Sequence, residues 1–189
     1  VELDPKFARA WEMLSALYSV APSWGIGDLD EYLTLSDDAA DEEIVDLFLD
    51  TKLPPVIYDD LRAFLDQVRY PLAVRSSSLL EDSTMQPFSG IFDTYLVPNN
   101  DPSFNVRLKH LTDCIKLVYA SIYSPHSRSS FEAINYKLEE EKMAVVIQEV
   151  VGTVHDDYFY PHVSGTAQSH NYYPVAHMKP EDGFALAAV

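Results

Sequence analysis

The stretch that decides the fold is 71–99, PLAVRSSSLLEDSTMQPFSGIFDTYLVPN. A short apolar run leads to Arg75, consecutive serines follow at 76–78, and a second alternating segment covers 91–97. The apolar run predicts a buried strand over 72–76, with the arginine at its end. A guanidinium is a planar fork of donors that stays charged, and the neighbouring hydroxyls and backbone amides add more donors. The pattern therefore favours a polyphosphate ligand.

The same stretch leaves an alternative for Arg75. An acidic pair, Glu81 and Asp82, follows the serines, and a surface ion pair with either carboxylate would also account for the arginine. Exposed ion pairs of this kind contribute little to stability. From the residues alone, Arg75 is either a phosphate ligand or one half of a surface ion pair.

The composition is that of a globular, acidic chain. Of 189 residues, 47% are hydrophobic and 23% are charged, and the formal net charge is −17. A charge of this sign argues against nucleic acid or an anionic membrane as a partner. Phosphate binding would then depend on local donors and on a divalent cation.

Cysteine content and hydropathy indicate the compartment. The single cysteine, Cys114, lies in an apolar helical pattern and is expected to be a buried, inert thiol in a reducing cytoplasm. No apolar run approaches the roughly 20 residues that span a bilayer, and the N-terminus lacks the apolar core of a signal peptide. We therefore expect a soluble, cytoplasmic protein without a membrane partner.

Periodicity predicts an α+β chain. Met143–Val151 is nearly all apolar, which predicts a strand buried on both faces, closed by Gly152. Residues 158–174 read as strands near a hairpin, and 184–189 opens another strand. Helical spacing recurs over 41–49, 55–68, 103–122 (with Ser103 as the cap) and 127–141. The positions expected to face the core are Ile44, Leu47, Phe48, Ile57, Leu61, Phe64, Leu65, Val68, Val106, Leu108, Leu111, Ile115, Val118 and Ile122.

Several segments together resemble one protein family. VRSSSLLED at 74–82, followed by PFSGIFDTYL at 87–96, resembles the nucleotide-binding domain of the phosphoenolpyruvate synthase and pyruvate phosphate dikinase family. MAVVIQEVVG at 143–152 is similar to a later strand of that family, with a glutamine near its end. YFYPHVSGTAQSHNYYP at 158–174 is similar to the strand pair that follows. The segments occur in the family's order and cover most of 70–183.

The resemblance implies a fold and a set of site residues. The fold would be part of an ATP-grasp-type domain, with a mixed or antiparallel sheet and flanking helices, in which the nucleotide lies between two lobes. Arg75 would contact the phosphates, with Ser76 and Ser77 shaping the turn beside it. Gln148 would lie near the base, although its amide could be satisfied either by an adenine edge or by a neighbouring backbone group. Glu149 is the weaker candidate, because successive side chains of a strand point to opposite faces.

The resemblance also implies an activity for the complete protein. Such an enzyme uses Mg-ATP to phosphorylate a histidine on a separate domain, which then passes the phosphoryl group to pyruvate. The family's Gly-Gly-Lys segment is absent from this sequence, and its metal ligands are expected outside this chain. A strand that begins at Phe184 and stops at the C-terminus likewise predicts a fragment of a longer protein. Because phosphoryl transfer depends on positioning and on metal ions, we expect this piece alone, which has only part of a binding wall, not to turn over ATP, and we assign it no catalytic residue.

The histidines are not expected to carry the phosphoryl group. Ser169-His170-Asn171 lacks the paired glycines and the following alanine of the family's phospho-accepting segment. His155, Asp156, Asp157 and His162 match neither a helical ligand face nor a zinc framework, and they predict a polar hairpin tip.

The N-terminus predicts a separate small unit. Residues 1–24 form a helix that resembles the first helix of a tetratricopeptide repeat, and 25–189 would be the partial nucleotide-binding domain. The helix is either a fusion remnant or, as we prefer, a packing helix, since one repeat cannot form an array. Together with the acidic surface, it leaves a rival function open: a non-catalytic nucleotide-sensing or protein-interaction module.

Overall fold

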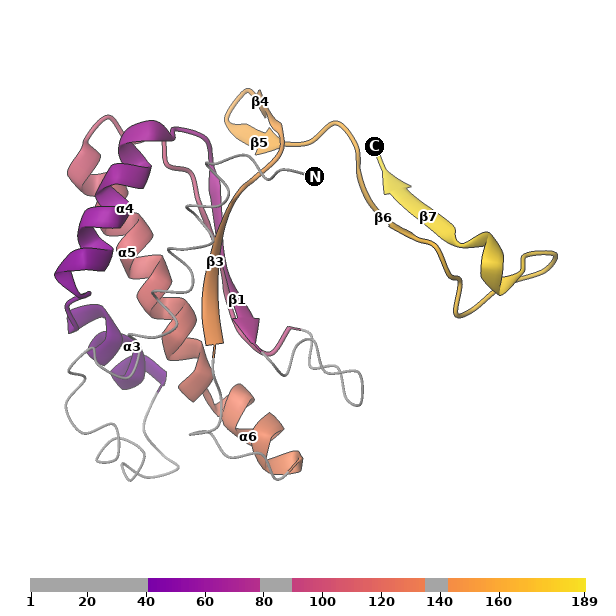
Figure 1. The fold of residues 1–189 in the computed structure, drawn as a ribbon, viewed down its shortest axis with the longest axis horizontal. Helices are drawn as coiled ribbons and strands as arrows, with labels where there is room; N and C mark the ends of the chain where they lie inside the picture. Colours follow the sequence, from indigo (N-terminus) through magenta and orange to yellow (C-terminus); the bar gives the residue numbers. More distant parts are fainter. Residues whose placement is uncertain (1–40, 79–89, 135–142) are drawn as a thin grey trace. The chain divides into compact units, whose positions relative to one another are not determined.

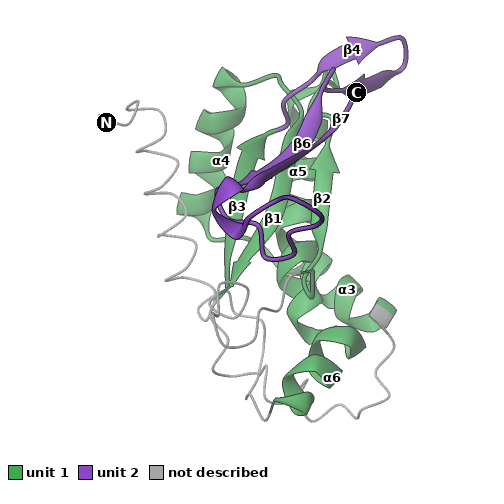
Figure 2. Cartoon of the chain, turned by 90° about the vertical axis from the view of Figure 1, so that its right-hand side faces the viewer, with its two compact units in different colours: residues 1–149 green, residues 150–189 purple. Residues whose placement is uncertain are grey.

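The computed structural model describes residues 41–78, 90–134 and 143–189 (Figure 1). The chain divides into two compact units, residues 1–149 and 150–189 (Figure 2), which we call unit 1 and unit 2. The predicted N-terminal helix, the acidic pair at 81–82 and the acidic helix end at 139–141 lie outside the described residues. The domain boundary at residue 24 stays a prediction.

Unit 1 is built on an antiparallel sheet. Its strands are β1 (Leu72–Ser78), β2 (Thr94–Val97) and β3 (Met143–Glu149), in the order β2-β1-β3. In this register Arg75 lies opposite Thr94 on one side and Val146 on the other. The predicted first strand, 72–76, is two residues too short at its C-terminal end. β1 continues through Ser78 because β3 pairs with it along its whole length, so Arg75 lies in the middle of a strand.

The second strand is shorter than the alternation over 91–97 predicts. Gly90 adopts a positive φ of 85°, a conformation that glycine tolerates without strain. Ile91 and Phe92 are then buried outside the sheet, where the Phe92 and Phe131 ring centroids are 6.1 Å apart. The backbone N–H of Asp93 donates to the Ser121 hydroxyl, so regular strand pairing begins only at Thr94.

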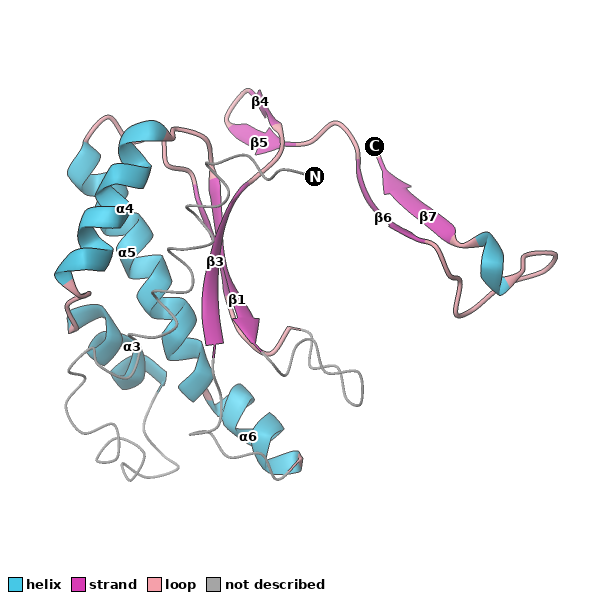
Figure 3. Ribbon diagram, viewed as in Figure 1, coloured by secondary structure: helices cyan, strands magenta, loops and turns pink. Residues whose placement is uncertain are grey.

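Helices and strands form two layers in unit 1 (Figure 3). Helix α5 packs on all three strands, and α3 and α4 pack on α5. The fold class is therefore α+β, as the sequence predicts. The helices are α3 (Asp41–Asp50), α4 (Pro55–Gln67), α5 (Phe104–Ala120), the 3-10 turn η2 (Ser121–Tyr123) and α6 (Pro125–Ala133).

The core lies between α5 and one face of the sheet. Every predicted core position is buried or half-buried, and Leu61, Leu65, Leu111 and Ile115 have no exposed surface. The prediction that β3 is buried on both faces is wrong. Met143 and Val145 are buried, but Ala144 and Val146, which point to the other face, are only half-buried. An antiparallel sheet with a helix layer on one side buries only one face of each strand.

Two helix boundaries differ from the sequence predictions. Ser103 precedes α5, but its side chain makes no capping bond; its own N–H donates to the Asp101 carboxylate at 2.7 Å. Helix α6 begins earlier than predicted, because Ser124 caps it and accepts from the Ser127 N–H at 3.2 Å. α6 ends at Ala133, and the rest of the predicted helix, 135–141, lies outside the described residues.

A buried arginine ties the helix layer together. Arg107 of α5 has no exposed surface, and its Nη1 donates to the carbonyls of Leu65 and Val68 and to Asn99 Oδ1. The two carbonyls belong to the C-terminal end of α4, so one guanidinium joins α4, α5 and the turn after β2. Burial lowers the pKa of Arg107. The predicted core did not include Arg107, because it was based on apolar residues only.

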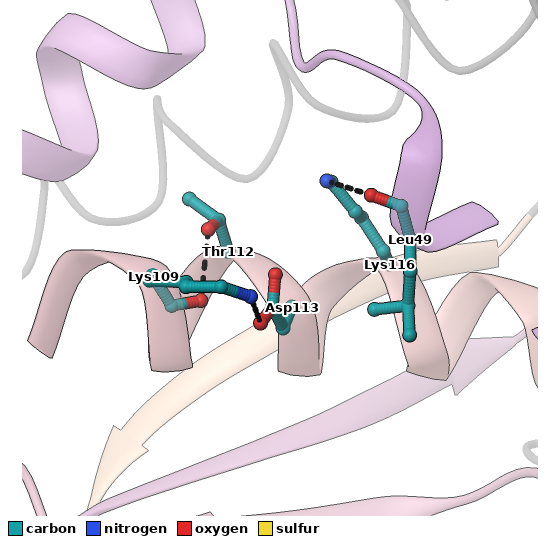
Figure 4. A network of polar contacts seen from close by, with 5 residues as sticks. All are labelled: Leu49, Lys109, Thr112, Asp113 and Lys116. Carbon is teal, nitrogen blue, oxygen red and sulfur yellow. Dashed lines mark hydrogen bonds and ion pairs between the residues drawn. The ribbon is translucent and has the colours of Figure 1, made fainter. Parts of the chain in front are cut away.

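A lysine links α3 to α5 (Figure 4). Lys116 Nζ donates to the carbonyl of Leu49 at 2.7 Å, next to the C-terminal end of α3. A cation at a helix C-terminus is favourable because it meets unpaired carbonyls. Lys109 and Asp113, one turn apart on α5, form an ion pair on the same helix.

Unit 2 consists of two antiparallel ribbons. The first pairs β4 (Thr153–His155) with β5 (Tyr158–Tyr160), and Asp156 turns the chain with a φ of 55°. The second pairs β6 (Ser164–Gln168) with β7 (Phe184–Ala188). The 3-10 turn η4 (Pro180–Asp182) lies between these two strands in the sequence, directly before β7. The predicted hairpin strands and the final strand are confirmed. No helix in the described part of the chain is long and apolar enough to cross a membrane.

Candidate functional site

One face of the sheet in unit 1 remains exposed. Because side chains alternate along a strand, the face that packs on α5 and the face that points away from it carry different residues. Leu96 on the second face is 70% exposed, and the polar side chains there are exposed as well. We call this surface the open face; it consists of Ala73, Arg75, Ser77, Thr94, Leu96, Ala144, Val146 and Gln148.

Arg75 and Gln148 meet on the open face. Their positions are diagonal across the β1–β3 pair, since Arg75 lies opposite Val146 and Gln148 lies opposite Ala73. Long side chains reach each other across such a diagonal. Arg75 Nη1 donates to Gln148 Oε1 at 3.4 Å. The structure therefore brings together the two strongest candidates from the sequence, which are 73 residues apart.

The serines after Arg75 do not share one environment. Ser76 and Ser78 are buried on the side of the sheet that packs on α5, and Ser77 is exposed on the open face. None of them shapes a turn, because all three belong to β1, and this corrects the sequence prediction. Of Ser76 and Ser77, only Ser77 lies on the same face as Arg75.

Glu149 lies apart from the open face. It is opposite Leu72 in the register, on the face of β3 that follows Met143, Val145 and Ile147. Its carboxylate affects Tyr70, whose pKa is raised first by burial and second by Glu149. The alternation that predicted opposite directions for Gln148 and Glu149 is present in β3, and Gln148 is the one beside Arg75.

Each of the four polar side chains of the open face can donate hydrogen bonds. The Arg75 guanidinium, the Ser77 and Thr94 hydroxyls and the Gln148 amide all lie on it, and none of its residues is a carboxylate. Such a set suits the oxygens of an anion, which accept hydrogen bonds. A local cluster of donors also explains how a strongly acidic chain can present a surface to a phosphate.

Thr94 is the site residue that the sequence did not single out. It lies in the quoted segment FDTYL, but nothing in the segment gives its partner strand or register. The register puts Thr94 directly opposite Arg75, with its side chain exposed on the open face. Strand alternation could have shown that Thr94 and Leu96 share a face. Only the pairing of β1 with β2 shows that this face is the one that carries Arg75.

A hollow lies at the junction of α3, α4 and α5. Its volume is about 390 Å³, and Lys52, Asp59, Thr112 and Lys116 are among the residues that line it. Charges of both signs are present, and Lys116 is already committed to the Leu49 carbonyl. Unlike the open face, the hollow is therefore lined by carboxylates, Asp50 and Asp59, as well as by donors.

The predicted polar hairpin tip is confirmed for Asp156 and Asp157, which form the turn between β4 and β5, whereas His155 ends β4 and His162 lies after β5. His155 stacks on Tyr160 with ring centroids 4.0 Å apart, and Thr153 Oγ1 lies 2.9 Å from His155 Nε2. His162 follows the hairpin and meets His155 edge to face. Within 41–78, 90–134 and 143–189, no group of three His, Cys, Asp or Glu side chains could hold a metal ion.

Comparison with known proteins agrees with this donor-rich sheet. A family model described as pyruvate phosphate dikinase, AMP/ATP-binding domain, matches residues 20–189. The match includes every described strand and helix, so the domain is of the nucleotide-binding class. The chain belongs to the pyruvate phosphate dikinase AMP/ATP-binding domain family. A comparison with curated proteins found no match.

Proposed function

We propose that the open face forms one wall of an ATP site in an ATP-grasp-type domain, with Arg75 as a phosphate ligand. The observation that carries the proposal is the joint projection of the Arg75 guanidinium and the Gln148 amide from one exposed face. Ser77 and Thr94 extend the same donor set. Membership in an AMP/ATP-binding family supports a nucleotide over other anions.

We expect the ligands of Mg²⁺ to lie outside this chain. The open face has no carboxylate, and the described parts of the chain hold no cluster of three His, Cys, Asp or Glu. Ser76 and Glu149, which the sequence also nominated, lie on the opposite face. The proposed role of this chain is therefore to bind and orient a nucleotide through hydrogen bonds.

The test is calorimetric titration of ATP, with Mg²⁺ present, into the full-length protein that carries this chain. A charge-assisted contact contributes roughly 1.5–3 kcal/mol. Arg75→Ala should therefore weaken binding about 10- to 150-fold, and thermal unfolding should be little changed. Arg69→Ala is the matched control, because Arg69 is an exposed arginine outside the open face. Equal affinity of Arg75→Ala and wild type would remove Arg75 from the site.

We further propose that this wall serves a phosphotransferase like pyruvate phosphate dikinase. ATP would donate a phosphoryl group to a histidine of a separate domain, and pyruvate would then accept it. Family membership is the support, and the half-buried thiol of Cys114, the single cysteine, fits a cytoplasmic location.

Labelling the full-length protein tests this activity. With ATP radiolabelled at its β- and γ-phosphates, we expect an acid-labile phosphoprotein that pyruvate discharges, and less label in Arg75→Ala. ATP binding without any phosphoprotein would instead favour a non-catalytic nucleotide-sensing module.

A further inference from the structure

The contact between Arg75 and Gln148 fixes the orientation of an amide. A guanidinium has only donors, so the atom of Gln148 that faces it must be the amide oxygen, Oε1, and the N···O distance is 3.4 Å. The Gln148 Nε2 group is then the part that points away from Arg75. Both side chains consequently present donors to whatever lies on the open face.

We propose that Gln148 is a positioning residue that holds the Arg75 guanidinium for phosphate, and that it does not read the nucleotide base. The proposal rests on the proposed function, since it concerns the same ATP wall. The amide oxygen of Gln148 accepts from Arg75, and this bond sets the direction of the whole amide from the guanidinium side. The sequence expectation that Gln148 lies near the base is thereby replaced by a role that acts through Arg75.

The neighbouring residues allow this arrangement. Ala73, opposite Gln148, has a side chain too short to separate the amide from the guanidinium. Val146, opposite Arg75, is half-buried and β-branched, so it gives the arginine stem a stiff neighbour. Gln148 itself is exposed and contributes little to the core. Its hydrogen bond is therefore more important for the direction of Arg75 than for the stability of the sheet.

The short distance between Arg75 and Gln148 indicates which part of a nucleotide the two side chains would meet. The ribose separates the base from the phosphates, whereas Arg75 and Gln148 are in direct contact. A pair of donors that close together meets one region of the ligand, and a permanent positive charge selects the phosphates. Loss of Gln148 should accordingly weaken every ligand that carries the same phosphate chain, whatever its base.

The experiment titrates ATP, GTP and inorganic tripolyphosphate into the full-length protein by calorimetry, all with Mg²⁺. Gln148→Met keeps the length of the side chain and removes the acceptor. We expect it to weaken all three probes by the same factor, about 3- to 10-fold for one lost hydrogen bond. In an Arg75→Ala background the same substitution should change none of them, because Gln148 then has nothing to position.

Two further variants keep the test sharp. Gln67→Met is the matched control, since Gln67 is an exposed glutamine on α4 that bonds only the Ala63 carbonyl, and it should leave all three affinities unchanged. Gln148→Glu keeps an oxygen beside Arg75 but neutralises the guanidinium. It should weaken all three probes more than Gln148→Met does, with no loss of thermal stability.

The outcomes separate this inference from the proposed function. If Gln148→Met weakens ATP but leaves tripolyphosphate unchanged, or alters the ATP-to-GTP ratio, Gln148 reads the base and the inference is wrong while the ATP site stands. Additive effects of the Arg75 and Gln148 substitutions would also overturn it. If wild type binds none of the three probes, the proposed function fails, and the inference fails with it.

Discussion

Asn99 Oδ1 accepts a hydrogen bond from Arg107 Nη1 at 2.9 Å, and both side chains are buried. Asn99 Nδ2 in turn donates to the carbonyls of Val68 and Tyr70, at 3.3 and 3.1 Å. The pair thus connects the turn after β2, which contains Asn99, with the chain that enters β1. This connection holds the two strands together at the end where Leu72 pairs with Val97.

We expect Arg107→Met to lower the free energy of unfolding by about 2–4 kcal/mol, because the Leu65 carbonyl and Asn99 Oδ1 lose the donor that Arg107 supplies. Asn99→Ala should cost about 1–3 kcal/mol for the same reason. Urea denaturation measures both, and the double mutant should be less destabilised than the sum of the two. Arg69→Met is the control, and a stability of Arg107→Met equal to that of Arg69→Met would contradict the prediction.

The two faces of β1 predict opposite effects for neighbouring serines. Ser77→Ala removes a hydroxyl from the open face and should weaken ATP binding about 2- to 10-fold, with unfolding unchanged. Ser76→Ala removes a buried hydroxyl on the helix side and should lower stability by about 1 kcal/mol, with ATP affinity unchanged. Calorimetry and thermal unfolding of the two variants, side by side, give the comparison. A Ser76→Ala variant with the larger loss of affinity would show that the face assignment is wrong.

A new acid opposite Arg75 should compete with phosphate. Thr94→Glu places a carboxylate at the position directly across from Arg75, where an opposite-charge pair contributes about 0.2–1 kcal/mol. Stability should rise slightly, and ATP affinity should fall by about tenfold or more because the guanidinium is neutralised. Thr94→Gln is the isosteric neutral control. ATP binding by Thr94→Glu equal to that by Thr94→Gln would argue against phosphate at Arg75.

Tyr119 predicts how stability depends on alkaline pH. Burial raises the pKa of Tyr119 from its ordinary value of 10.0, so above pH 10 the unfolded chain loses the phenolic proton while the folded chain keeps it. Unfolding is therefore favoured as pH rises, by up to about 1.4 kcal/mol per pH unit. Tyr119→Phe should remove this part of the loss between pH 10 and 11 in urea denaturation series. The same steepness in wild type and variant would assign the alkaline loss to other groups.

Part of the site could be predicted from residue types alone. An arginine after an apolar strand stood out as a charged fork of donors beside three serines, and a glutamine within VVIQEVV stood out because its amide must find a partner. The alternation of Gln148 and Glu149 followed from strand geometry by itself. The predicted core was equally accessible, because helical periodicity marks apolar positions directly.

Other features could not be predicted because they depend on partners distant in the sequence. The pairing of β1 with β3 extends the first strand through Ser78 and puts Ser76 and Ser77 on opposite faces. Thr94 becomes a site residue only through its register with Arg75. Arg107 was not predicted to be buried, because its guanidinium is satisfied by acceptors from other segments, the Leu65 carbonyl and Asn99 Oδ1.

The sequence by itself determined the α+β class and the family, and it nominated Arg75 as a candidate ligand, since local periodicity and a few ordered motifs carry that information. The tertiary structure decided what Arg75 meets. Strand pairing is a long-range choice of register, and a shift of one residue would send every side chain to the other face. In the observed register the guanidinium contacts the Gln148 amide, and Arg75 lies opposite Thr94. The three side chains therefore form one surface of hydrogen-bond donors.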